Sequence, residues 1–104
     1  MTDSSTQDTA RRLEMENLLR AAHVHRRRGD YTQAQQVVAR ALELSPDDAE
    51  ARELAADLTL ARGELEQAAA AYKALFDEDK TRVQVEEKYA RVIVQIAEGR
   101  RQQE

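Results

Sequence analysis

The chain has 104 residues and a formal net charge of −4, and 18 of its 43 hydrophobic residues are alanine. Leu, Ile, Val and Phe together number only 20, so the composition supports one domain with a thin core. The absence of cysteine excludes disulfides, thiolate metal sites and cysteine nucleophiles, and three glycines and one proline are too few for β-sandwiches, barrels or glycine-rich phosphate loops. We therefore predict an all-α fold.

Hydropathy and charge indicate the expected location of the protein and the partners that it is not expected to bind. No apolar run approaches the roughly 20 residues of a membrane span, and residues 1–9 are polar where a secretion signal would be basic and then apolar. The stretch from Glu43 to Asp79 holds eleven acids against three bases, which disfavours nucleic acid as a partner. We expect a cytoplasmic protein with no membrane insertion and no nucleic-acid binding.

The first two helices are delimited by capping residues and glycine. Residues 1–9 are expected to form a disordered lead-in, and a helix should start near Ala10 behind a polar cap. Its apolar stripe closes at Gly29-Asp30, where glycine suits the end of a helix. The spacing then predicts a second helix from about Tyr31 to Leu44.

The remaining helices follow stop and start signals. In Ser45-Pro46-Asp47-Asp48, serine is the expected cap of a third helix and proline its first residue, and that helix should end at Arg62-Gly63. A fourth helix is predicted from about Leu65 to Phe76. A fifth is expected to begin near Thr81, after an acidic break.

The chain repeats itself every 34 residues. Shifting it by that period gives seven identities in 34 positions, against about three expected by chance. The matched pairs are Glu16 with Glu50, Ala21-Ala22 with Ala55-Ala56, Arg28-Gly29 with Arg62-Gly63, and Gln33-Ala34 with Gln67-Ala68.

A helix pair of this period resembles the tetratricopeptide repeat (TPR) family, most closely over the stretch from Arg28 to Pro46. The resemblance implies antiparallel helix pairs stacked as a right-handed solenoid of about five helices. It divides residues 10–104 into a first pair (10–46), a second pair (47–79) and a terminal helix (80–104). A generic alanine-rich bundle or coiled coil is the alternative, and glycine just past two helix ends argues against it.

The repeat gives the alanines a role. Small residues where paired helices cross allow the usual separation of about 8–10 Å between helix axes. The alanines expected at these crossings are Ala22, Ala34, Ala41, Ala56, Ala68 and Ala90.

No constellation of residues indicates catalysis, a cofactor or a metal. His23 and His25 are two residues apart, so on a helix they point about 200° from each other and cannot share a metal ion. His25 is more simply a core ring, and the basic cluster at 26–28 more simply complements the end of a helix than binds an anion. We predict a non-enzymatic protein.

In TPR proteins generally, the first helices of the pairs line a concave groove that binds a peptide or a helix. The resemblance places in such a groove Leu19, Arg20, His23, Arg26, Glu53, Leu54, Asp57, Leu60, Lys88 and Arg91. His23, Asp57 and Arg91 share one repeat position, so they are expected either to orient a ligand or to form an internal ladder of Asp57 with Arg91. Of the residues that clamp chaperone tails in some family members, only Lys88 fits, so we predict no binding of that kind.

The terminal helix has an unusually wide apolar arc, about twice the stripe that a surface helix needs. Its side around Val83, Ile93 and Val94 has no following partner in the sequence. Either a continuation of the chain or another protomer covers it, or it is a modestly exposed cap. The main hypothesis is thus a protein-binding module, and the alternative is a scaffold segment that forms a homo-oligomer through this helix.

Overall fold

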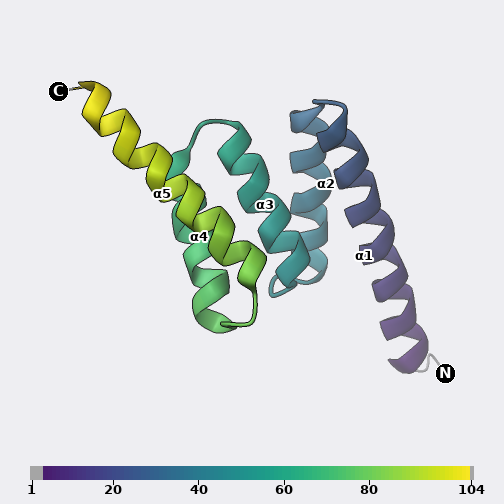
Figure 1. Cartoon of the computed structure of the whole chain (residues 1–104). Coiled ribbons are helices and arrows are strands. Elements are labelled where there is room, and N and C mark those ends of the chain that lie inside the picture. The colour runs from purple at the N-terminus through teal and green to yellow at the C-terminus, as the bar shows by residue number, and fades with distance from the viewer. Residues whose placement is uncertain (1–3, 104) are drawn as a thin grey trace. The chain divides into compact units, whose positions relative to one another are not determined.

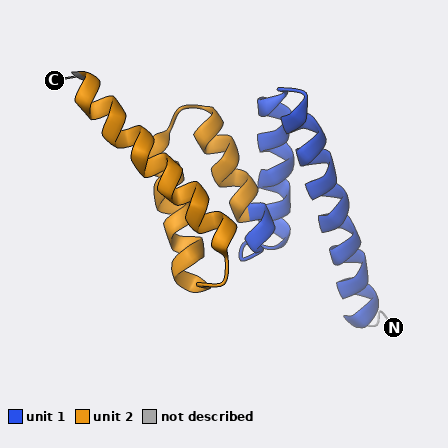
Figure 2. Cartoon of the chain, in the orientation of Figure 1, with its two compact units in different colours: residues 1–51 blue, residues 52–104 orange. Residues whose placement is uncertain are grey.

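A computed structural model describes residues 4–103, and over that range the backbone forms five helices and no strand (Figure 1). They are α1 (Ser4–Arg27), α2 (Tyr31–Leu44), α3 (Ala49–Ala61), α4 (Leu65–Glu78) and α5 (Val83–Gln103). The all-α prediction is confirmed. The chain divides into two compact units, residues 1–51 and residues 52–104 (Figure 2).

In the first unit, α1 packs along α2. Alanines are fully buried in this packing: Ala22 of α1 and Ala34 and Ala41 of α2 are 0% exposed. Met15 and Val38 are also buried. Because so small a core contains so few large side chains, close approach of the two helices has to provide most of the contact.

In the second unit, α5 packs along α4. Helix α3 contacts both of them, through Asp57 to Tyr72 of α4 and through Glu53 to Lys88 of α5. Among the described residues, the largest fully buried side chains all belong to this unit: Leu54, Leu58, Tyr72, Leu75, Val85 and Val92. Ala56 and Ala68 are buried as the repeat predicts. Ala90, predicted to be a crossing residue as well, is exposed instead.

Two matching turns separate the paired helices. Gly29 and Gly63 have φ of 81° and 83°, a left-handed conformation that side chains disfavour. At the first turn the amide of Asp30 donates to the carbonyl of His25 (2.9 Å), and at the second Glu64 donates in the same way to Thr59 (3.2 Å). Each is a Schellman motif, which satisfies the free carbonyls at the end of the helix.

The connection from α2 to α3 differs from the prediction. Ser45 ends α2 rather than capping α3, because its amide donates to the Ala41 carbonyl (2.9 Å). Pro46 lies in a turn closed by the amide of Asp48 on the Ser45 carbonyl (3.2 Å), a position where its fixed φ is favourable. The cap of α3 is Asp48, whose carboxylate accepts the amide of Ala51 (2.9 Å).

The other helix ends lie within a few residues of the prediction, except at the N-terminus. There α1 already includes Ser4, six residues before the expected start, so the predicted lead-in is helical from residue 4. No glycine or proline interrupts this segment, and the Thr9 hydroxyl donates to the Ser5 carbonyl (2.8 Å). Residues 1–3 of the predicted lead-in lie outside the described residues.

Candidate partner-binding surfaces

Three predicted groove residues meet in the second unit, Glu53 and Asp57 from α3 and Lys88 from α5. The ammonium of Lys88 lies 2.6 Å from Glu53 Oε2 and 3.1 Å from both carboxylate oxygens of Asp57. The side chains of Lys88, Glu53 and Asp57 are 32%, 20% and 12% exposed. Charge-assisted hydrogen bonds of this length fix the three groups in place, while their outer edges still meet solvent.

Tyr72 of α4 completes this cluster, and the sequence prediction missed it. Its ring is fully buried, and its hydroxyl donates to Asp57 Oδ1 at 2.5 Å. Lys88 Nζ lies 6.0 Å from the centre of the ring. Tyr72 occupies the position that Val38 occupies in the preceding unit of the 34-residue repeat. The signal in the sequence was therefore a tyrosine at a core position, where its hydroxyl needs a hydrogen-bond partner.

The neighbours of Lys88 determine its charge. Partial burial lowers its pKa, but the hydrogen bonds to Glu53 and Asp57 and their negative charges outweigh that effect and hold the pKa above its ordinary value. Lys88 is therefore cationic at neutral pH. In this state it can orient a ligand's polar groups, but it is a poor general base.

In the first unit, a shallow hollow of about 350 Å³ lies over α1 and the first turn of α3. Its lining includes three predicted groove residues, Leu19, Arg20 and His23. It also includes Glu50, whose carboxylate lies 3.8 Å from His23 Nε2. A nearly buried leucine beneath a rim of charges of both signs suits one side chain of a bound segment.

The other predicted groove residues are distributed differently. Leu54 is 1% exposed and belongs to the core, so its placement on the groove surface was wrong. Arg26 and Leu60 are half-buried, and Arg91 is exposed. Asp57 is held by Tyr72 and Lys88, which come from the neighbouring helices, whereas a ladder with Arg91 was one of the two arrangements expected from the repeat position.

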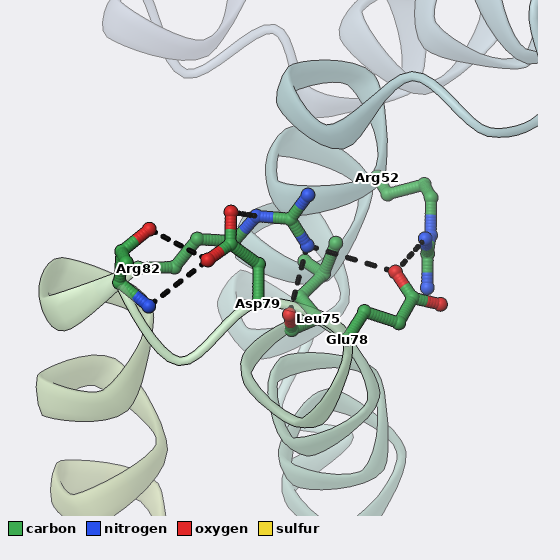
Figure 3. A network of polar contacts seen from close by, with 6 residues as sticks. Arg52, Leu75, Glu78, Asp79 and Arg82 are labelled. Atoms are coloured by element: carbon green, nitrogen blue, oxygen red, sulfur yellow. Dashed lines mark hydrogen bonds and ion pairs between the residues drawn. The ribbon is translucent and has the colours of Figure 1, made fainter.

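The turn between α4 and α5 fixes where α5 starts (Figure 3). Arg82 donates to the Leu75 carbonyl at the end of α4 (2.8 Å), one of the carbonyls that a helix leaves free. Glu78 lies between two guanidinium groups, 2.6 Å from Arg52 and 3.6 Å from Arg82. The hydrogen bond from Arg52, followed by the contact with Arg82, lowers the pKa of Glu78.

The three residues predicted for self-association lie on the surface of α5. Val83, Ile93 and Val94 are 59%, 41% and 54% exposed. Ile93 also lines a hollow of about 480 Å³ between α4 and α5. The exposure shows that α5 is not fully covered within the chain.

The described residues hold neither a cluster of metal ligands nor a membrane-spanning helix. Between residues 4 and 103, His, Asp and Glu side chains nowhere gather in threes as ligands of a metal ion would. None of the helices in that range combines the length and the apolar character needed to span a membrane.

Comparisons with known proteins agree with this architecture. A family model described as tetratricopeptide repeat matches residues 19–81. Among solved structures, the C-terminal TPR-containing domain of a Plasmodium falciparum FK506-binding protein is similar, with a TM-score of 0.78 and 17% sequence identity over 97% of this chain and 67% of that one. No curated protein matches. With the family model covering more than half of its length, the chain belongs to the tetratricopeptide repeat family.

Proposed function

We propose that the chain is a non-enzymatic module of the cytoplasm that binds a segment of another protein along the first helices of its repeats. The observation that carries this proposal is the cluster of Lys88, Glu53 and Asp57. These charges come from the first helices of two successive repeats, and each is held in place yet partly exposed. Fixed polar groups favour binding because little side-chain freedom is lost when a ligand arrives.

The charge of the surface indicates the chemistry of the segment. The cluster holds two carboxylates against one ammonium, and both carboxylates come from the part of the sequence where acids exceed bases by eight. Complementary charge speeds encounter and selects among partners. We infer that the bound segment presents a basic or amide side chain to Glu53.

Isosteric substitutions test the proposal. Proteins captured by the immobilised full chain would be identified, and the shortest binding segment would be titrated as a synthetic peptide against the wild type and Glu53→Gln. We expect Glu53→Gln to weaken binding about tenfold or more, because it removes a charge that faces the ligand. The affinity of the wild type should also fall as salt is raised.

The matched control is Glu66→Gln on α4, which makes the same chemical change at an exposed position. It should bind like the wild type. Equal losses of affinity in both variants would show that overall charge, rather than the cluster, weakens binding. Unchanged affinity in Glu53→Gln would show that the cluster is not part of the binding surface. Circular dichroism on each variant would check whether the helices remain.

A further inference from the structure

Along one face of α5, residues recur at the alternating spacing of four and three that is typical of a helix packed against another helix. Glu86, Ala90, Ile93, Ala97 and Arg100 are spaced four, three, four and three residues apart, so they form one stripe along the helix. Its centre is apolar and open: Ile93 is 41% exposed, Ala90 is exposed, and Ala97 is half-buried. The buried side of the same helix, with Val85 and Val92, faces α4.

The 34-residue register shows what kind of group this face would receive. Ala90 occupies the position that Ala22 and Ala56 occupy in the two preceding units of the repeat. Those two alanines are 0% and 2% exposed, whereas Ala90 is open. A small residue at this position allows a second helix to approach closely, so the fitting occupant is a helix.

A hollow of about 480 Å³ adjoins the stripe. From α4 it is lined by Lys73, Phe76 and Asp77, and from α5 by Tyr89, Ala90 and Ile93, among others. The lining is mainly apolar with a charged rim, as in the centre of a protein interface. A helix lying on the stripe would place side chains into this hollow.

The charges at the two ends of α5 indicate which helix would lie on the stripe. Glu86 and Glu87 lie near its beginning, and Arg100 and Arg101 lie near its end. Among the described residues, no ion pair within the chain engages any of these four side chains. The pattern is self-complementary: turned end for end about Ile93, which lies midway between Glu86 and Arg100, it places acid opposite base and apolar opposite apolar.

We propose that α5 pairs with α5 of a second copy of the chain, antiparallel, with the two-fold axis at Ile93. Glu86 of each copy then faces Arg100 of the other, and Ala90 lies within one residue of Ala97 of the other at a close crossing. A parallel pair would instead place Glu86 against Glu86, which like-charge repulsion disfavours. Such an isologous contact is the commonest way for identical chains to associate.

The length of α5 sets the expected strength. Its 21 residues span roughly 31 Å, so one helix crossing buries an area at the small end of specific interfaces. We expect a reversible dimer with a dissociation constant in the micromolar range, on the order of 10 μM. Sedimentation of the full chain should accordingly show a shift from monomer to dimer as concentration rises.

Charge exchange gives the sharpest test. Glu86→Arg alone and Arg100→Glu alone should each weaken the dimer about tenfold or more, because both place like charges together. The double variant Glu86→Arg/Arg100→Glu should restore dimerisation, since acid again meets base in the antiparallel pair. A double variant no stronger than the single ones would overturn the antiparallel pairing.

A second pair of variants tests the apolar centre. Ile93→Asp should leave a monomer, whereas Leu13→Asp, at a 53% exposed position of α1, should still form the dimer. Because the chain has no cysteine, Ile93→Cys supplies a single thiol, which should form an intermolecular disulfide faster than the thiol of Leu13→Cys. A wild type that stays monomeric at about 0.5 mM, well above the expected dissociation constant, would overturn the proposal, with another helix left as the occupant.

Discussion

Three glycines differ in what they do for the fold. Gly29 and Gly63 hold left-handed turns, whereas Gly99 lies in α5 with ordinary helical geometry. Apart from adjacent backbone, no heavy atom lies within 4 Å of a methyl group added at any of them. The effect of substitution therefore comes from the backbone alone.

Replacement by alanine should have opposite signs at two of these sites. Gly63→Ala is expected to lower the free energy of unfolding by about 1 kcal/mol, because alanine disfavours positive φ. Gly99→Ala is expected to raise it by roughly 0.5–1 kcal/mol, since alanine is the better helix former. Urea unfolding measures both, and effects of the same sign would contradict this account.

Lys88 is expected to stabilise the second unit through its two carboxylate partners. Lys88→Met leaves the carboxylates of Glu53 and Asp57 without their cation, and we expect a loss of about 1 kcal/mol in unfolding free energy, allowing for partial exposure. Lys73→Met is the matched control, because Lys73 pairs with Asp77 on an exposed surface. Its effect should be clearly smaller.

The pH dependence of that difference has a defined sign. The pKa of Lys88 is raised by folding, so its contribution is fully present below the unfolded value and is lost as pH rises through the folded one. The stability gap between wild type and Lys88→Met should stay constant at neutral pH and shrink above the ordinary lysine pKa of 10.5. A stability gap that does not change with alkaline pH would show that the charge of the Lys88 ammonium does not cause the difference between the two proteins.

At the scale of an element, the start of α3 depends on one carboxylate. Asp48→Ala removes the acceptor of the Ala51 amide and should cost about 1 kcal/mol of stability. Ser45→Ala keeps the backbone amide that ends α2, so it should be nearly neutral. Thermal unfolding of the two variants distinguishes the caps, and the reverse order would favour serine as the cap.

The turn from α4 to α5 should show an acid titration of its own. The Thr81 hydroxyl and then its amide donate to Asp79, at 2.6 and 3.0 Å, and they lower the pKa of that carboxyl. The stabilisation is thus present above the unfolded pKa and is lost as pH falls through the folded one. By NMR, Thr81→Ala should move the Asp79 midpoint upward, while Asp77, held by lysines, keeps its midpoint.

At the scale of the whole molecule, dimerisation through α5 would link stability to concentration. A contact made only by the folded chain stabilises it by mass action. The thermal midpoint of the wild type should therefore rise with protein concentration, and that of Ile93→Asp should not. Parallel slopes for the two proteins would contradict the proposed contact.

The sequence by itself determined the helices, the 34-residue period, the glycine turns and the burial of five of the six alanines predicted at helix crossings. These features follow from local backbone preferences and from the spacing of apolar residues, both of which can be read along the chain. The resemblance to the tetratricopeptide repeat family implied that Glu53, Asp57 and Lys88 share one groove, and these three side chains do meet.

Only the tertiary structure decided which side chains contact one another across helices. Tyr72 joined Asp57 and Lys88, Leu54 entered the core, and Asp48 rather than Ser45 capped α3. Ala90 remained open although its equivalents are buried. The physical reason is that a periodic pattern specifies the face of a helix but not its neighbours, and burial and hydrogen bonding depend on both.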